Sequence, residues 1–329
     1  MKYKYTVEKI REKRSSRFGI LTTLCLLTLI AIGGSVYTFR EQLIELVRQP
    51  DLLEYPEAKR CSECHQSIYE SWKESRHSIA WKSKTYIEAT KNRSKEKCLP
   101  CHIPEEVKAG IKPVPRIKNR EDGVYCVPCH VIENKMNGPY DLFSPPHPTV
   151  QNPEYRKSKI CGSCHEKTYD QWVSSGSEKT CQDCHMPRSK KRLVQKFPLE
   201  YLHSKKLVGD HRFIRGEITD QDLLVSSEMK SNRLHITLLN RLIPHLLPTA
   251  TSGDPRLFLY IRFFDRDGNE IEKTKEIFAP QQKTALPFGE KMMLQYKPAR
   301  ETSRIEILLQ FKASWSKEKK VIRKIELAL

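Results

Sequence analysis

One five-residue pattern occurs five times in this 329-residue chain and constrains its fold more than any other feature. The pattern is Cys-x-x-Cys-His, and its copies stand at residues 61–65, 98–102, 126–130, 161–165 and 181–185. It is the attachment signature of c-type haem, in which two thiols bond to one edge of a porphyrin and the histidine binds the iron. The five copies fall within the 125 residues from Cys61 to His185, which is too dense for chance. The sequence therefore predicts five haem c groups on one short stretch of chain.

The cysteine count supports this interpretation. Of eleven cysteines, ten stand in the motifs, and Cys25 lies in an apolar run, so no pair remains for a structural disulfide. A zinc site is the alternative, but it takes ligands in sets of four and does not need a histidine after every second cysteine. The predicted covalent attachment residues are Cys61, Cys64, Cys98, Cys101, Cys126, Cys129, Cys161, Cys164, Cys181 and Cys184. The predicted proximal iron ligands are His65, His102, His130, His165 and His185.

The N-terminal region predicts a membrane anchor. Residues 1–17 form a basic tail with seven Lys or Arg, and residues 18–39 are 22 residues without a charge. As a transmembrane helix this run is about 33 Å long, against a hydrocarbon core of about 30 Å. The basic tail predicts a cytoplasmic N-terminus, a single pass through the cytoplasmic membrane and a haem region on its outer, periplasmic side. The alternative is a cleaved signal peptide with a weak cleavage site at residues 31–33.

The charge of the chain narrows the choice of partner. The formal net charge is +18, from 58 Lys and Arg against 40 Asp and Glu. Each haem c brings two propionate carboxylates. We therefore expect many of the excess Lys and Arg side chains to pair with propionates inside the protein. No basic stripe lies on a recognisable nucleic-acid-binding motif, so no nucleic-acid partner is expected. Attraction to an acidic redox partner or to anionic lipid stays open.

The rest of the chain divides into a linker and two domains. Residues 40–58 predict a stalk that begins as a helix and ends at prolines. Residues 59–223 allot about 33 residues to each haem, too few for a conventional core, so we expect short helices and loops around the porphyrins. Helices are expected after two motifs, at residues 66–76 and 166–173, and prolines and lysines predict an exposed connection at residues 103–120.

Residues 224–329 predict a small antiparallel β-sandwich. Apolar and polar residues alternate there, which is typical of strands with one buried face. An Asp-Gly pair at residues 267–268 predicts a hairpin turn. The expected strands cover residues 233–240, 257–265, 272–278, 291–296, 304–312 and 321–329.

Six histidines outside the motifs bear on the function: His77, His147, His203, His211, His235 and His245. Five distal ligands would make every haem six-coordinate, which suits electron transfer, whereas a five-coordinate iron has an open position for a substrate. His235 lies in a predicted strand on the side opposite its apolar residues, and we expect it to be exposed.

Several longer segments resemble, in the same order, a multihaem superfamily that contains the tetrahaem cytochrome c of ammonia oxidisers and hydroxylamine oxidoreductase. The segments are CSECHQSIYESWKESRHSIAW, GVYCVPCH with NGPYDLFSPPHP, KICGSCHEKTYDQWVSSGSEKTCQDCHMPR, GDHRFIRG, and NRLIPHLLPTA with LFLYIRFFDRDGNEI. The resemblance covers about residues 59–272 and includes the sandwich domain often fused behind such haem domains. No motif ends in lysine, so the lysine-ligated catalytic haem of pentahaem nitrite reductases is absent.

The resemblance implies distal iron ligands at four positions. They are His77 of Ser-x-His, His147 of Ser-Pro-x-His, His211 of His-Arg-Phe and His245 of Pro-His-x-x-Pro-Thr. His203 stays a fifth candidate. If His203 binds iron, all five haems have a distal histidine. If it does not, one haem has an open position.

We therefore expect a membrane-anchored pentahaem c-type cytochrome of a respiratory chain that relays electrons on the outer face of the cytoplasmic membrane. Its expected partners are redox proteins, among them a membrane oxidoreductase complex. The alternative is an oxidoreductase that acts on a small nitrogen or sulfur compound at one five-coordinate haem. A third interpretation is a structural subunit whose sandwich docks a larger complex. No catalytic residue is predicted, and the choice between electron carrier and enzyme stays open.

Overall fold

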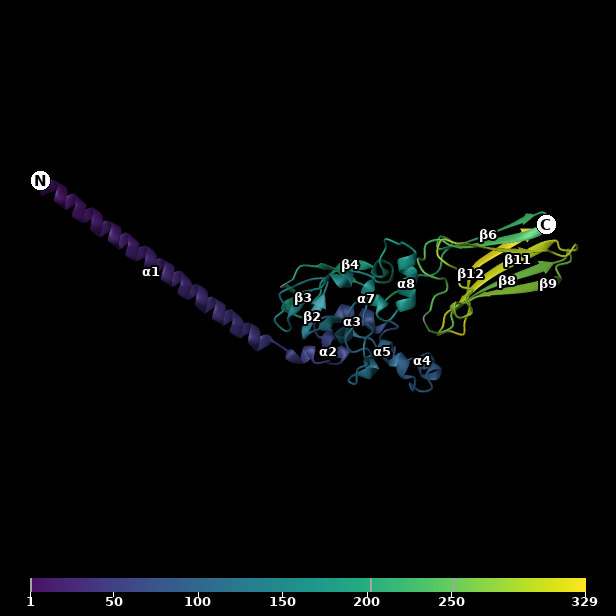
Figure 1. Ribbon diagram of the computed structural model, residues 1–329, viewed down its shortest axis with the longest axis horizontal. Helices are drawn as coiled ribbons and strands as arrows, with labels where there is room; N and C mark the ends of the chain where they lie inside the picture. The colour runs from purple at the N-terminus through teal and green to yellow at the C-terminus, as the bar shows by residue number, and fades with distance from the viewer. Residues whose placement is uncertain (1, 202, 251) are drawn as a thin grey trace.

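The computed structural model describes residues 2–201, 203–250 and 252–329, except for the side chains of residues 2–21, 43 and 46. Three parts follow one another along the molecule: a long N-terminal helix, a middle domain of short elements and a C-terminal pair of β-sheets (Figure 1). The N-terminus and the C-terminus lie at opposite ends.

The N-terminal helix α1 spans Lys2–Val47 without interruption. Within it, Thr22–Gln42 is a 21-residue stretch of mean hydropathy 1.7, long and apolar enough to cross a membrane, and none of it is buried. A signal sequence satisfies the same test. The predicted stalk is helical only to Val47 and continues as the short 3₁₀ helix η1 (Pro50–Leu53). The predicted basic tail is helical from Lys2, but its side chains lie outside the described residues.

The middle domain consists of one- and two-turn helices and very short strands. The two helices expected after motifs are α3 (Gln66–Lys73) and α8 (Glu166–Ser174). The other α-helices are α2 (Ala58–Ser62), α4 (Lys84–Ala89), α5 (Leu99–His102), α6 (Cys126–His130), α7 (Lys159–Gly162) and α9 (Cys181–His185). The 3₁₀ helices are η2 (Glu96–Cys98), η3 (Arg120–Asp122), η4 (Pro153–Arg156) and η5 (Leu199–Tyr201). The strands are β1 (Val131–Ile132), β2 (Lys135–Gly138), β3 (Thr149–Gln151), β4 (Arg188–Lys191) and β5 (Lys206–Gly209).

Protein side chains alone give this domain little apolar core. One buried cluster consists of Ala58, Trp72, Tyr125, Val127 and Val131. Another consists of Trp81, Tyr86 and Ile103. Because clusters of this size cannot stabilise a domain, the large cofactors predicted from the motifs are needed to complete the core.

Residues 103–120 are not the fully exposed connection that the prolines predict. Ile111 and Ile117 are exposed, but Ile103 and Arg116 are buried. The Arg116 guanidinium donates hydrogen bonds of 2.6–3.0 Å to the backbone carbonyls of Pro104, Lys118, Asn119 and Gly123. In a helix or strand, backbone N–H groups would donate to these carbonyls. Prolines have no N–H, so the Arg116 side chain donates to the carbonyls instead.

The C-terminal domain has two antiparallel sheets. One has the strand order β10-β7-β6 and the other β12-β11-β8-β9. Their bounds are β6 (Leu223–Lys230), β7 (Arg233–Asn240), β8 (Arg256–Phe264), β9 (Glu270–Phe278), β10 (Lys291–Tyr296), β11 (Arg304–Lys312) and β12 (Lys320–Ala328). Alternate residues of both sheets meet in one apolar core, which includes Leu234, Ile236, Leu238, Leu259, Ile261, Ile305, Ile307 and Leu309. This pattern agrees with the period-two alternation in the sequence.

Two details differ from the sequence prediction. Strand β6, with the sequence LLVSSEMK, was not predicted, because its edge position lets serine and glutamate replace apolar residues. Leu329, the last residue of the expected final strand, lies outside β12 and is 53% exposed. It follows the end of β12 at Ala328, where the pairing with Arg304 stops.

Candidate haem-binding sites

Each Cys-x-x-Cys-His motif folds into a tight helical turn. In the first and fourth motifs the histidine N–H donates to the carbonyl of the first cysteine at 2.9 Å (His65 to Cys61, His165 to Cys161). The third and fifth motifs form α6 and α9, and the second motif runs from Cys98, the last residue of η2, through α5. Residues three and four positions apart lie on the same face of a helix, so this turn brings both thiols and the imidazole to one side. The local backbone thus suits attachment to one porphyrin edge.

The ring nitrogen Nδ1 of four motif histidines contacts a backbone carbonyl oxygen. The pairs are His65 with Leu193 at 2.7 Å, His102 with Ala80 at 2.6 Å, His130 with Asn137 at 2.8 Å and His185 with Ile214 at 2.8 Å. A carbonyl only accepts, so Nδ1 carries the proton and Nε2 keeps its lone pair. Fixing the tautomer and ring orientation in this way is the usual arrangement behind metal-binding histidines.

Four motif histidines face a second histidine from elsewhere in the chain. The ring centres are 6.4 Å apart for His65 and His147, 6.2 Å for His77 and His165, 6.2 Å for His130 and His211, and 6.5 Å for His185 and His245. Because a histidine nitrogen binds a metal at about 2.0 Å and the ring centre lies about 1.1 Å behind it, two rings on opposite sides of one iron have centres about 6.2 Å apart. The observed separations therefore fit two axial ligands of one iron in each pair.

The fifth motif histidine has a different neighbour. His102 is stacked against the Tyr86 ring, with centres 3.8 Å apart and planes at 15°. Among the described residues, no second histidine ring faces it. His203, the fifth distal candidate, lies on the wall of the same cavity but makes no ring contact with another histidine in the described chain. The structure therefore does not bring His203 to His102.

One continuous cavity of about 2480 Å³ connects all five motifs. Its wall includes all ten motif cysteines and every candidate iron ligand, and the strand residue His235 is not part of it. A single small-molecule site has a volume of about 300–1,000 Å³, so this space fits several cofactors side by side.

Two buried hydroxyls in the wall support the fit to a cofactor with carboxylates. The hydroxyls of Tyr86 and Tyr125 have no hydrogen-bond partner among the described residues. Buried polar groups are normally paired, and haem propionates can accept from both hydroxyls. No motif feature marked these tyrosines in advance. The donor set, the paired rings and these atoms together fit haem c.

Burial keeps the candidate distal ligands neutral. Removal from water, reinforced by the facing histidine, lowers the pKa of His77 to about 3 and the pKa of His147 and His211 to about 4. Only a neutral imidazole has a lone pair for a metal. These rings are therefore ready to bind iron at neutral pH without losing a proton.

Cysteines of different motifs lie close together. The thiols of Cys61 and Cys126, of Cys101 and Cys164, and of Cys161 and Cys181 lie close enough to shift one another's pKa. The charge of Cys129 also acts on Cys161 and Cys164, so the third motif lies near the fourth. Each motif's two cysteines mark where one edge of a porphyrin would attach. Every motif therefore has at least one neighbouring motif whose porphyrin edge would lie close to its own.

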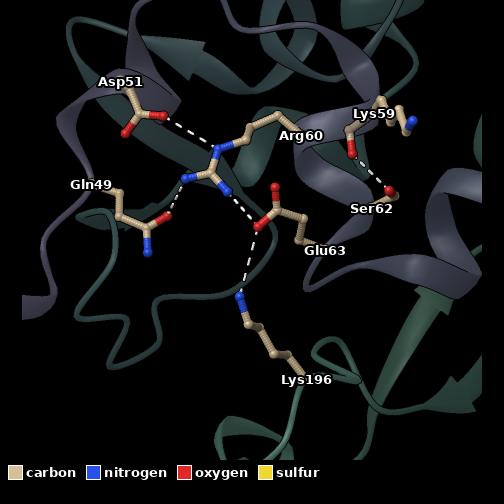
Figure 2. A network of polar contacts seen from close by, with 7 residues as sticks. All are labelled: Gln49, Asp51, Lys59, Arg60, Ser62, Glu63 and Lys196. Carbon is tan, nitrogen blue, oxygen red and sulfur yellow. Dashed lines mark hydrogen bonds and ion pairs between the residues drawn. The ribbon is translucent and has the colours of Figure 1, made fainter.

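A polar network fixes the first motif to the end of the N-terminal linker (Figure 2). Arg60, directly before the motif, donates to Gln49 at 2.8 Å and to Asp51 at 3.3 Å, and it forms an ion pair with Glu63. Lys196 lies 3.7 Å from the same Glu63 carboxylate. The linker, the first motif and the segment near residue 196 are therefore held as one unit.

The β domain contacts the haem region through the loop that carries His245. The Leu246 N–H donates to the Gln171 side chain of α8 at 3.1 Å, and the Asn240 side chain donates to the His245 carbonyl at 2.8 Å. These contacts hold the His245 ring opposite His185, so the two domains share one candidate site.

Comparisons with known proteins support a multihaem c-type cytochrome. A family model described as cytochrome c554 and c-prime matches residues 60–131, and one described as cytochrome c7 and related cytochrome c matches residues 116–186. The structure is similar to a penta-heme cytochrome c552 from Thermochromatium tepidum, with a TM-score of 0.59, 16% identity and coverage of 83% of this chain and 99% of that one. At this identity the likeness shows the fold alone.

Two other structural matches carry no argument because their TM-scores are low. A DUF3823 family protein from Bacteroides ovatus has a TM-score of 0.22 and 12% identity over 32% of this chain and 50% of that one. A hypothetical protein from Pyrococcus horikoshii has a TM-score of 0.21 and 12% identity over 32% of this chain and 84% of that one. No curated protein matches the chain at a significant level.

Proposed function

We propose that this multihaem c-type cytochrome carries five covalently attached haems and relays single electrons between them. Bound haem supplies a one-electron ferric–ferrous couple whose potential depends on its axial ligands. The protein's part is to fix each porphyrin edge through two cysteines, to hold the axial histidines in one orientation and to exclude water. The superfamily of the tetrahaem cytochrome c and hydroxylamine oxidoreductase is part of this proposal, and the order of the motifs supports it.

The observation that carries the proposal is the set of four histidine pairs with ring centres 6.2–6.5 Å apart. Two histidines on opposite sides of an iron leave no open position for a substrate, and such sites transfer electrons with little structural change. We assign His147, His77, His211 and His245 as the distal ligands opposite His65, His165, His130 and His185.

The contacts between motifs support a continuous path. The thiol contacts link the first motif to the third, the second to the fourth and the fourth to the fifth, and Cys129 links the third to the fourth. Electrons received at any motif can therefore reach any other through neighbouring porphyrin edges. The first motif is next to the N-terminal linker, so it is the site nearest the proposed membrane anchor.

The proposed location is the outer face of the cytoplasmic membrane, with helix α1 retained as a single-pass anchor. The hydropathy of Thr22–Gln42 and the basic residues before it support this topology. The partners are then redox proteins on that side, among them a membrane oxidoreductase complex as donor.

A second candidate function rests on His102. Its ring faces Tyr86 and no histidine among the described residues, which favours a five-coordinate iron there. A five-coordinate site can bind a small nitrogen or sulfur compound, and the four histidine-paired sites would then supply its electrons.

Low-temperature EPR of the oxidised protein tests the ligand assignment. We expect low-spin ferric signals from four haems and a high-spin signal from one. Five low-spin haems would remove the second candidate function, and two or more high-spin haems would contradict the histidine pairs.

Electron counting tests the relay itself. Fully reduced protein mixed with an excess of an oxidised soluble cytochrome c should lose its ferrous spectrum completely and deliver one electron per haem. Delivery of a fraction of the electrons would show that the sites are not connected. Repeated turnover with nitrite or hydroxylamine as the sole acceptor would favour the enzyme.

A further inference from the structure

Trp315 of the β domain lies against two arginines of the haem domain. It stands in the turn between β11 and β12, and its ring centre is 5.0 Å from Cζ of Arg76 and 4.3 Å from Cζ of Arg215. The face of an indole ring attracts a guanidinium, so Trp315 holds both cations close together.

Neither arginine has a carboxylate partner within the described part of the chain. Other arginines of the protein do: Arg212 is paired with Asp210 and Arg256 with Asp254. Arg76 and Arg215 both line the cavity that contains the motifs. Two guanidiniums gathered at a cavity wall repel each other unless an anion lies between them, and a guanidinium fork fits a carboxylate.

The two arginines also lie beside one particular pair of iron ligands. Arg76 directly precedes His77 in the chain. Phe213, two residues before Arg215, packs edge-on against the His77 ring with centres 4.2 Å apart. The charge of Arg215 also acts on the rings of both His77 and His165. The unpaired cations therefore lie at the haem site of the fourth motif.

We propose that Arg76 and Arg215 form an oxyanion site that binds the propionate carboxylates of the haem held by His77 and His165, and that Trp315 positions both arginines. The inference rests on the proposed function, because it needs a haem at that site. It gives the β domain a second role beside supplying His245: through Trp315 it sets the reduction potential of a haem that the domain does not ligate. A small free oxyanion has the same chemistry and is the alternative occupant.

The direction of the effect follows from charge. A cation near the haem stabilises the reduced, less positive iron, so removing it lowers the potential. Arg76→Gln and Arg215→Gln should each shift one of the five potentials downward and leave four unchanged. Trp315→Ala should shift the same potential in the same direction, and Trp315→Phe, which keeps an aromatic face, should stay near the wild type.

The experiment is a potentiometric titration of the full haem-loaded protein, followed by EPR so that the moving potential is assigned to a low-spin haem. Arg304→Gln is the matched control, because Arg304 is stacked on Phe264 at 3.9 Å but lies outside the cavity wall. Arg215→Lys keeps the positive charge and should shift the potential less than Arg215→Gln. If the glutamine variant loses haem, the lysine variant replaces it in the titration.

Unchanged potentials in the Arg76, Arg215 and Trp315 variants would overturn the inference. So would a wild-type potential that moves with added nitrate at constant ionic strength, since the site would then hold a free anion. The haem content and spin state of the wild type are measured in the same samples. If these are as proposed and the potentials do not move, only the arginine site is wrong, whereas missing haems would contradict the proposed function as well.

Discussion

At the scale of single residues, hydrogen bonds to backbone carbonyls select which nitrogen is free for iron in six of the candidate ligand histidines. His130 and His211 illustrate this for both members of one pair, since their Nδ1 atoms contact the carbonyls of Asn137 at 2.8 Å and Gly209 at 2.9 Å. Both Nε2 atoms are then free to bind a metal placed between the rings.

Replacing one distal ligand should open one site. His211→Ala removes the ring opposite His130, so the reduced protein should bind carbon monoxide at one haem more than the wild type does, as measured from the visible spectrum. His203→Ala is the control and should leave carbon monoxide binding unchanged. Carbon monoxide binding that is unchanged in His211→Ala, or that increases in His203→Ala, would contradict the ligand assignment.

A buried carboxylate next to His211 should matter for stability. Asp210 accepts hydrogen bonds from Ser71 Oγ at 2.7 Å, from the Arg212 backbone N–H at 2.9 Å and from Arg212 Nε at 2.8 Å. Asp210→Asn puts an amide donor among these donors, and we expect the free energy of unfolding to fall by about 1.5–3 kcal/mol in denaturant titrations.

The chain offers a matched control for that variant. Asp254 is bonded to Arg256 two residues later, at 2.8 and 2.9 Å, but its side chain is 43% exposed. Asp254→Asn should lower the free energy of unfolding by less than about 1 kcal/mol. Equal losses in the two variants would show that burial of Asp210 is not the cause.

At the scale of elements, the two sheets of the C-terminal domain depend on side chains from β7, β8 and β11 that are almost completely buried. Ile307 in β11 is 1% exposed. Ile307→Ala leaves a cavity between the sheets and should lower the free energy of unfolding by about 2–5 kcal/mol, measured by loss of the β-sheet circular dichroism signal.

The control for this variant lies on β10. Met293 is 73% exposed, so Met293→Ala should change stability by about 0.5 kcal/mol or less. If Ile307→Ala were as mild as this control, the proposed packing of the two sheets would be incorrect.

Helix α1 has two competing roles that one measurement separates. A retained anchor predicts that the mature protein stays in the membrane fraction after carbonate washing and that mass spectrometry finds peptides from residues 18–39. Mature protein in the soluble fraction, with an N-terminus after residue 33, would instead establish a cleaved signal peptide.

Local patterns predicted the elements well, and long-range pairing was much harder to predict. The motif positions and strands such as β7 and β11 follow directly from spacing and alternation. The partner of each motif histidine is set by the three-dimensional fold, so spacing alone could not distinguish His203 from the candidates that face a motif. The buried Arg116 and the contact of Trp315 with two arginines also join residues with no common sequence signal.

At the scale of the whole molecule, the arrangement runs from an apolar helix through the first motif to the β domain (Figure 1). The Arg60 network contacts the motif nearest the helix, and the His245 ring of the β domain lies opposite His185 of the fifth motif. On the proposed ligand assignment the β domain belongs to the redox unit, because it supplies His245 and contacts two arginines of the haem cavity.

The intact mass of the exported, full-length protein tests the number of attached haems most directly. We expect the mass of the polypeptide plus five haems, and plus four haems for a variant with Cys98→Ser and Cys101→Ser. A polypeptide without added haem, or one whose cysteines all react with a thiol reagent, would contradict both the proposed cofactors and the proposed electron relay.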